Sequence, residues 1–344
     1  MTAVATPPSA GTPAPSPLSA GPSTRRRRMG SIGFRTFTYL ALLLIIIPAA
    51  WILLGVLLKA VGHWRWDVLW TKLTPAGGGL RDQILGTLII MVGVLIIAGS
   101  IGVLAGIHLS EMAPIRKNGK RSGGFLRTSS DVLAGFPSIV LGYVGYTAFV
   151  VGLHWGYSLL AALIILSIMV IPYIAKTTEN SLRQVPTGYR EGAEALGMTM
   201  GYSLRKVVLK SAAPGIVTGL LLAMAIACGE TAPLIYTAGF GNTLSHSLTH
   251  ADFPYLTYVV FTFYDQPNVQ LHYLAYDAAL ILVVIILLLL VLSRILVART
   301  QRHAEGARTK SRSPRSPRSP RRPKGGDGDP ASEGVDVSGI AART

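Results

Sequence analysis

Apolar residues occur along the chain in long runs that charged residues rarely interrupt, which is the pattern of membrane-spanning helices. A span needs about 20 mostly apolar residues. Residues 132–175 carry no charge at all and are long enough for two spans with a turn at 154–157. We therefore predict six spans, at residues 36–58, 83–110, 132–175 (two helices), 214–238 and 274–296. The predicted fold class is an all-α membrane protein.

Two apolar segments need separate treatment. Residues 36–58 exceed the apolar core of a cleavable signal peptide, which is about 7–15 residues long, and Lys59 follows them, so we interpret them as an uncleaved span. Residues 255–263 are apolar but too short to cross a bilayer. We place them in an outer loop that dips toward the membrane or lies on it.

Composition and charge agree with a membrane protein and orient it. Half of the 344 residues are hydrophobic and 14% are charged, whereas about a quarter of a soluble domain is charged. With both termini inside, 28 of the 32 Lys and Arg residues lie inside and 4 lie outside. Cytoplasmic segments carry such an excess of Lys and Arg, so we predict that both termini are cytoplasmic. The single cysteine, Cys228, excludes an intramolecular disulfide framework.

The two ends of the chain differ in composition from the middle. Residues 1–35 and 299–344 are rich in small and polar residues and hold 11 of the 16 net positive charges. They cannot bury enough apolar surface to offset chain entropy, so we expect disordered basic tails that anchor the topology and touch anionic lipid. The Ser-Pro-Arg repeats at 311–323 contain no aromatic residues for base stacking, which disfavours nucleic-acid binding.

The chain contains no sequence for a nucleotide-binding loop. Residues 119–122 read Gly-Lys-Arg-Ser, but the upstream Gly of a Gly-x4-Gly-Lys-Ser/Thr motif is missing. Any ATP-driven work must therefore come from a partner protein. His246 and His250 lie near Asp252 in an outer loop without a helix signal, and this context favours an ordinary loop over a metal site.

Segment 185–213, between the fourth and fifth spans, is predicted to dock a partner on the cytoplasmic side. Pro186 favours a helix start, and Gly197 suits the left-handed position after a helix. The resulting helix of about three turns is too short to be stable alone in water. Its residues Ala193 and Leu196 would fit a partner's groove; a connecting helix lying on the membrane is the alternative.

This segment resembles the E-A-A-x3-G loop of ABC importer permeases. Gly192 replaces the second motif residue, and Lys210 stands where Pro is usual. The resemblance implies a transport subunit rather than an enzyme, without a cofactor of its own. It implies that a separate cytoplasmic ATPase, which binds ATP and Mg²⁺, docks here. It also implies that five residues carry the coupling to that ATPase: Glu191, Gly192, Ala193, Leu196 and Gly197.

Further stretches, in order along the chain, narrow the resemblance to the phosphate ABC permease family PstA. They are residues 77–80, 105–111, 136–142, 176–180 and 229–234, within a permease domain at 36–298. The resemblance implies the type I importer (MetI-like) fold and the bacterial plasma (inner) membrane. It further implies a second permease PstC, two copies of the ATPase PstB, and the binding protein PstS, which delivers inorganic phosphate.

Glu230 lies within the predicted fifth span, where an acidic residue is costly and points to a functional site. An ionised carboxylate there accepts a hydrogen bond from the proton that phosphate retains and sulfate lacks. Alternatively, Glu230 pairs with Lys176 or a PstC cation, or it is protonated and bonded to backbone. Relatives often carry Arg where this chain has Ile226, so Lys176 is the remaining cation candidate. The predicted substrate pathway contains Glu230, Thr231, Lys176 and Ser138.

Glycine and proline positions indicate packing and bending. Gly99, Gly102 and Gly106 lie on one face of the second span and allow close helix approach. Pro137 and Gly142 indicate a kink in the third span. We assign the three glycines of the second span to helix packing rather than to a binding site, and we expect the kink, to which Ser138 also contributes, to lie near the pathway.

Two other functions remain as alternatives. One is an ABC permease for another small oxyanion such as sulfate or molybdate, against which the Gly-Glu-Thr-Ala-Pro-Leu stretch at 229–234 argues. The other is a self-sufficient secondary transporter. Its inverted repeats with broken helices are not apparent in the sequence.

Overall fold

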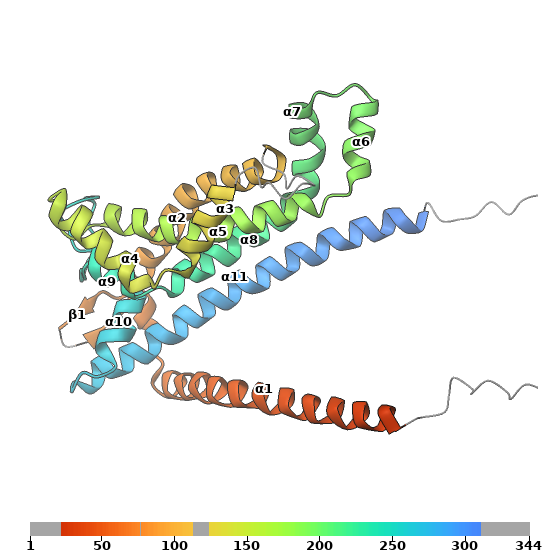
Figure 1. The fold of residues 1–344 in the computed structure, drawn as a ribbon. Coiled ribbons are helices and arrows are strands. Elements are labelled where there is room, and N and C mark those ends of the chain that lie inside the picture. The colour runs from red at the N-terminus through yellow and green to blue at the C-terminus, as the bar shows by residue number, and fades with distance from the viewer. Residues whose placement is uncertain (1–21, 76, 113–123, 311–344) are drawn as a thin grey trace, which may run out of the picture. The chain divides into compact units, whose positions relative to one another are not determined.

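The structure is a computed structural model that describes residues 22–75, 77–112 and 124–310, with the side chains of residues 34–298 within those ranges (Figure 1). The elements, in chain order, are α1 (Pro22–His63), η1 (Trp66–Leu69), β1 (Leu73–Thr74), β2 (Gly77–Gly78), α2 (Arg81–Ile107), η2 (His108–Met112), α3 (Gly124–Gly135), α4 (Ser138–Gly145), η3 (Tyr146–Gly152), α5 (Leu159–Arg183), α6 (Thr187–Ala195), α7 (Met200–Ser203), η4 (Leu204–Val208), α8 (Leu209–Gly229), α9 (Ala232–Thr237), α10 (Leu256–Phe263) and α11 (Val269–Lys310). Strands β1 and β2 pair antiparallel, and η2, η3 and η4 are π-helical turns.

Five helical segments of the described chain are long and apolar enough to cross a membrane. They are Phe34–His63, Arg81–Met112, Leu159–Arg183, Met200–Gly229 and Val269–Ala298. A bent pair, Gly124–Gly135 with Ser138–Gly152, makes a sixth when it is counted as one span. The predicted all-α fold class is confirmed, and the third span differs from a straight helix.

The third span is broken at Pro137. The two halves of the pair meet at an angle of 99°, and Pro137 is the residue that caps the start of α4. Proline has no backbone N–H and disfavours the helical conformation in the residue before it, here Phe136. The kink predicted at Pro137 is confirmed.

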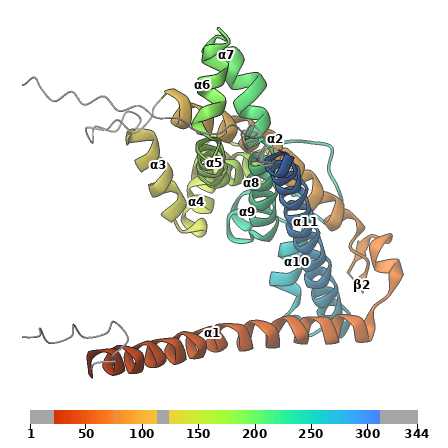
Figure 2. The same cartoon turned by 90° about the vertical axis from the view of Figure 1, so that its right-hand side faces the viewer.

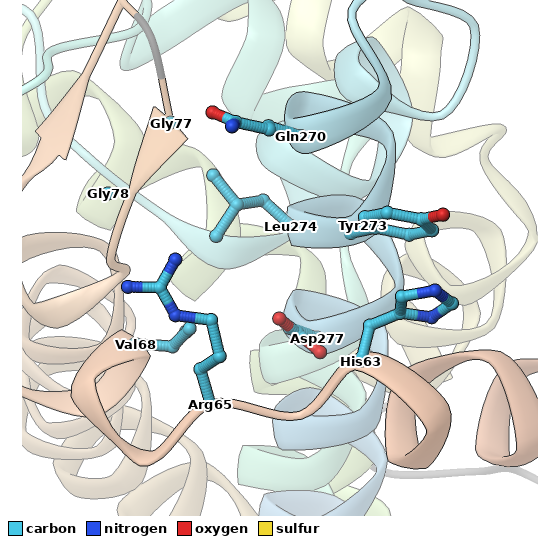
Figure 3. Close-up of a pocket in the computed structure, with 9 residues that line it drawn as sticks. All are labelled: His63, Arg65, Val68, Gly77, Gly78, Gln270, Tyr273, Leu274 and Asp277. Carbon is cyan, nitrogen blue, oxygen red and sulfur yellow. The ribbon is translucent and has the colours of Figure 1, made fainter.

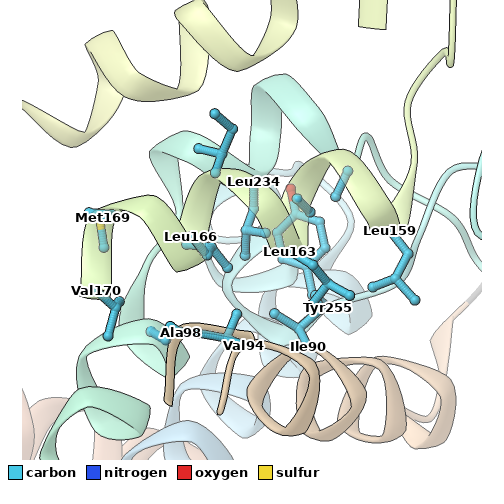
Figure 4. Packing of buried hydrophobic residues seen from close by; sticks show 14 of the residues in the cluster. Ile90, Val94, Ala98, Leu159, Leu163, Leu166, Met169, Val170, Leu234 and Tyr255 are labelled. Atoms are coloured by element: carbon cyan, nitrogen blue, oxygen red, sulfur yellow. The ribbon is translucent and has the colours of Figure 1, made fainter. Parts of the chain in front are cut away.

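Helices α2, α5 and α8 form the centre of the packing. Figure 4 shows Ile90 and Val94 of α2 facing Leu166 and Val170 of α5, with Leu234 of α9 beside them, all of them buried. Lipid is as apolar as these side chains, so close van der Waals packing rather than the hydrophobic effect holds helices together within a membrane. The closeness of α2 to α5 is therefore important for stability.

Glycines allow α2 to approach α5 closely at two of the three predicted positions. A Cβ on Gly106 would lie 2.5 Å from the Cβ of Thr178, and a Cβ on Gly102 would lie 2.7 Å from its nearest neighbour on α5. The packing role of these two residues is confirmed. The prediction for Gly99 is wrong in this respect. The atom nearest to a Cβ there is Cδ2 of Leu220 at 3.4 Å, an ordinary contact that does not require glycine.

The fifth span begins and ends earlier than predicted. Its helical segment runs from Met200 to Gly229 instead of over 214–238. Glu230 leaves the helix with φ −73° and ψ 134°, and the short helix α9 follows. Pro233 suits the first turn of α9 and, without an N–H, cannot continue the hydrogen bonding of α8. Glu230 therefore lies in a break between two helices rather than within one.

Residues 255–263 are part of the protein core. Leu256 and Val259 of α10 are buried against Leu274 and Ala278 of α11. That this segment belongs to an outer loop that dips toward the membrane or lies on it stays a prediction; the structure adds that one face of α10 is covered by protein. The sequence showed that the segment is too short to span a bilayer, but it did not show that α11 of the same chain covers its apolar face.

Helical structure extends into both predicted tails. Helix α1 begins at Pro22 and α11 ends at Lys310, inside the segments 1–35 and 299–344. Proline is favoured in the first helical turn, and arginines such as those at 25–28 are good helix formers. Residues 1–21 and 311–344, the rest of the predicted tails, lie outside the described residues.

Candidate functional site

The break between α8 and α9 fixes Glu230 at a half-buried position. The hydroxyl of Thr257, on α10, donates a hydrogen bond to the carbonyl oxygen of Glu230 at 2.9 Å. The backbone N–H of Glu230 donates to the carbonyl oxygen of Ala227 at 3.3 Å. Both backbone groups of Glu230 are thus satisfied without a continuous helix, which a buried backbone requires. The break is a stable feature that holds the carboxyl group in place.

Ser138, the first residue of α4, lies beside Glu230. Its hydroxyl lies near the Glu230 carboxylate and interacts with it. The two segments are close because α4 packs directly on α9: a Cβ on Gly142 would lie 2.7 Å from the Cα of Pro233. The structure therefore brings Ser138 close to Glu230 and the adjacent Thr231, and their part in a substrate pathway stays a prediction.

Lys176 pairs with another acidic residue, Asp131, and not with Glu230. Its Nζ lies 3.2 Å from Oδ1 of Asp131, and both side chains are exposed. It also lines a small pocket with Arg127 and Glu179. The predicted ion pair between Lys176 and Glu230 is wrong, and within the described ranges the ion pairs leave Glu230 without a cationic partner.

Ile226, one turn before Glu230, contributes packing and no charge. It is partly buried against the main core of α2, α5 and α8. An Arg at this position would place its charge against apolar side chains unless a partner compensated it. Helix α8 therefore supplies no cation near Glu230.

The sequence analysis missed a group of tyrosines next to this break. The ring centroid of Tyr236, on α9, lies 6.2 Å from that of Tyr143 and 6.5 Å from that of Tyr146. Each phenol carries a hydroxyl that both donates and accepts hydrogen bonds. Tyr143 and Tyr146 are three positions apart, which places both on one helix face. This spacing is the feature by which the sequence could have indicated the group.

The segment predicted to dock a partner has the predicted form. Helix α6 is short, and Gly197 follows it with φ +73°, so its left-handed conformation is confirmed. Helices α6 and α7 lie side by side in both views (Figure 1 and Figure 2). Glu191, Gly192 and Leu196 are exposed, and Leu196 retains 76% of its accessible surface.

Ala193 is the exception among the predicted contact residues. It is 4% exposed, because α6 packs against η4 and α7 of the same loop. Its side chain therefore holds α6 on the loop, and its role in the coupling stays a prediction. The apolar side chains that this loop does expose are Tyr189, Leu196, Met200 and Tyr202.

Gly192, within α6, and Gly197, which follows this helix, are expected to respond oppositely to alanine. A Cβ on Gly192 meets nothing within 4 Å, so Gly192→Ala should stabilise α6 by about 0.5–1 kcal/mol through reduced chain entropy. Gly197→Ala places a side chain at φ +73°, which costs roughly 1–2 kcal/mol. Amide hydrogen exchange of residues 187–197 should slow in the first variant and accelerate in the second; equal changes in both would contradict the assignment.

Several charged residues at the same end of the bundle were not assigned a role from the sequence. Glu111 ends the second apolar span and Glu179 lies near the end of the fourth, and both are paired with arginines, among them Arg127 and Arg190. The sequence feature that could have identified these two acids is their position. Each lies at or near the end of an apolar run, on the side where Lys and Arg are concentrated.

A separate pocket lies where α1 meets α11 (Figure 3). Asp277 of α11 is 3% exposed there, and the ring of His63 stacks on that of Tyr273 with centroids 3.7 Å apart. Arg65 lines the same pocket, but its guanidinium already pairs with Asp67. With one buried carboxylate and a neutralised arginine, the pocket has no surplus positive charge for an anion. We interpret it as the joint that attaches α1 to α11.

The family model and the curated relatives that match this chain are transport permeases. The family model described as "Binding-protein-dependent transport system inner membrane component" matches residues 100–302. Phosphate transport system permease protein PstA 2 of Mycobacterium bovis is 48% identical over 285 residues, which cover 83% of this chain and 93% of that protein. Phosphate transport system permease protein PstA of Yersinia pestis is 34% identical over 255 residues, covering 72% and 83%. A solved inward-facing structure of the MetNI methionine ABC transporter is 23% identical with a TM-score of 0.47, covering 64% of this chain and 94% of that chain.

Proposed function

The chain belongs to the PstA family of phosphate transport permeases, within the inner membrane components of binding-protein-dependent transport systems, and from this premise we propose that it forms half of the pathway of an ATP-driven importer of inorganic phosphate. It is a multi-pass membrane protein and an ABC importer permease. The substrate, the coupling and the partners are the proposal. The observation that carries the substrate assignment is the carboxylate of Glu230 beside Ser138 at the helix break.

A carboxylate at this position discriminates between oxyanions. Phosphate near neutral pH retains a proton and donates a hydrogen bond to Glu230, whereas sulfate has no proton to donate. A sulfate ion would leave the carboxylate facing a like charge without compensation, and sites built to hydrogen-bond a substrate reject analogues that lack the hydrogen-bonding group. The positive charge that phosphate requires comes from PstC in this proposal, because α8 carries Ile226 near the site.

The ATPase docks on α6 and α7. Their exposed apolar side chains, Tyr189, Leu196, Met200 and Tyr202, form a protruding surface that suits a groove on each PstB subunit. ATP and Mg²⁺ bind to PstB, and PstS delivers phosphate at the opposite face. Both termini lie on the cytoplasmic side with this loop, as the excess of Lys and Arg favours. ATP-driven closure of PstB then shifts the permease between inward-open and outward-open states through contacts that differ between them.

The test is uptake of radiolabelled phosphate at micromolar concentration in cells that lack every other phosphate importer. Cells with and without this chain are compared, with the partner subunits present in both and excess unlabelled sulfate as competitor. We expect uptake that requires the chain, ceases with an ATPase-dead PstB, and is insensitive to sulfate. Unchanged uptake without the chain would refute the phosphate assignment. Inhibition by sulfate would indicate a permease of broader oxyanion specificity.

A further inference from the structure

One arginine connects α6 to the ends of two core helices. Arg190, in the middle of α6, places Nη1 2.5 Å from Oε2 of Glu111 and Nη2 2.9 Å from Oε1 of the same carboxylate. The same Nη2 donates to the carbonyl oxygen of Leu182, on α5, at 3.3 Å. Glu111 lies in the π-helical turn η2 that ends α2. A single guanidinium thus joins α6, α2 and α5.

This contact is shielded from water at its acidic partner. The Glu111 side chain is 5% exposed and that of Arg190 is 30% exposed. Bidentate guanidinium–carboxylate pairs are among the strongest and most directional polar contacts. Removing one partner leaves a buried charge without compensation. The pair therefore keeps a fixed geometry better than an exposed ion pair would.

The ends of the core helices are also tied to one another. Arg127, on α3, donates from Nη2 to the carbonyl oxygen of Leu109 at 2.8 Å and pairs with Glu179 of α5 at 2.9 Å. Together with the close glycine contacts between α2 and α5, these bonds make the two helices a unit at this end. A displacement applied to either helix is expected to move both.

In the described part of the chain, the Arg190–Glu111 pair is the one ion pair that joins α6 to these helices. Helix α6 also packs on α7 and η4 and follows α5 through a short link. The link consists of residues 184–186, which lie outside the helices, and its Val185 is buried in a small core with Leu182 and Val208.

We propose that Arg190 and Glu111 form a clamp that transmits the movement of α6 to α2 and α5. This inference rests on the proposed coupling of α6 to a cytoplasmic ATPase. Arg190 is a positioning residue: it contacts neither ATP nor phosphate, and it acts through Glu111. When the ATPase moves α6, the clamp makes the core unit follow, and the pathway changes its accessibility. Without the clamp, α6 moves while α2 and α5 lag behind.

The experiment uses the complete transporter in proteoliposomes with PstS. ATP hydrolysis and phosphate uptake are measured in the same vesicles for the wild type, Arg190→Gln, Glu111→Gln and the double variant. Lys210→Gln is the matched control, because Lys210 is an exposed cation of the same loop and the substitution removes the same charge. A fluorophore on Leu153→Cys, in a Cys228→Ala background, reports ATP-driven movement without reference to phosphate; Leu153 is exposed and follows η3.

We expect each single variant to hydrolyse ATP while phosphate uptake per ATP falls at least about fivefold, with a matching loss of the fluorescence change. The double variant should be no worse than either single variant, because both remove the same contact. The Lys210→Gln control should retain the wild-type ratio. An unchanged ratio and an unchanged fluorescence response in Arg190→Gln would overturn the clamp. Loss of ATPase assembly in both single variants would overturn it as well, since the pair would then serve docking.

Failure of the clamp and failure of the proposed function are distinguishable. If the wild type transports no phosphate, the substrate assignment fails, and the fluorescence response to ATP still decides about the clamp. If the wild type transports phosphate and all variants respond as it does, only the clamp fails.

Discussion

Replacing Glu230 by Gln is expected to lower the kcat/KM of phosphate uptake by roughly 10- to 100-fold. The amide keeps the volume of the side chain. It lacks the negative charge that strengthens the hydrogen bond from the proton of phosphate. A hydrogen bond to a charged group contributes about 1.5–3 kcal/mol, which corresponds to about one to two factors of ten in affinity. The fixed backbone of Glu230 at the helix break should prevent the change from spreading into the fold.

Two companion variants separate a role in the pathway from a general effect of charge. Ser138→Ala removes the hydroxyl that lies next to the Glu230 carboxylate and should reduce uptake less, by about threefold to tenfold, since a neutral hydrogen-bonding group contributes about 0.5–1.5 kcal/mol. Asp265→Asn removes an exposed carboxylate and should leave uptake unchanged. The measurement is initial uptake at several phosphate concentrations, with the amount of assembled transporter determined for each variant. Wild-type uptake by Glu230→Gln would remove Glu230 from the pathway.

The second large effect is expected at Gly106. A Cβ there would lie 2.6 Å from the carbonyl oxygen of Ala175 and 2.5 Å from the Cβ of Thr178. The carbonyl belongs to the backbone of α5 and cannot move aside alone, so Gly106→Ala should push α2 away from α5. Overpacking of this kind costs about 1–3 kcal/mol, and the loss of close helix contact adds to it within a membrane.

Gly99→Ala is the matched control in the same helix. Both substitutions add one methyl group and gain the same helix propensity of about 0.5–1 kcal/mol. A Cβ on Gly99, however, makes only ordinary side-chain contacts, with Cδ2 of Leu220 at 3.4 Å and Cδ1 of Leu95 at 3.6 Å. Unfolding of the purified subunit by sodium dodecyl sulfate should begin earlier for Gly106→Ala and at the wild-type concentration or later for Gly99→Ala. Equal stability of the two variants would contradict the role of the close approach.

Much of the fold could be predicted because a bilayer imposes a simple rule on sequence. A segment that crosses it must be apolar over about 20 residues and must satisfy its own backbone hydrogen bonds, so helices follow from composition alone. The kink at Pro137 and the left-handed Gly197 were equally predictable. Proline lacks an N–H, and glycine tolerates a positive φ wherever these residues occur.

The candidate site could be predicted as a set of residues but not as an arrangement. The carboxylate of Glu230 was identified because charge is costly within an apolar run. The sequence did not reveal that Lys176 pairs with Asp131 instead of Glu230, that Ala193 faces inward, or that Glu230 lies outside the helix. Each of these depends on which segment lies opposite, and the hydrophobic pattern contains no information about opposing segments.

The sequence by itself determined that this protein is helical, spans a membrane, lacks a nucleotide-binding loop and belongs with the ABC importer permeases. Only the tertiary structure decided that Ser138 faces Glu230 and that Arg190 joins Glu111 across 79 positions of the chain. The reason is physical. Apolarity and backbone geometry act locally along the chain, whereas ion pairs and close contacts depend on how helices distant in sequence pack, which the shapes of all their side chains decide together.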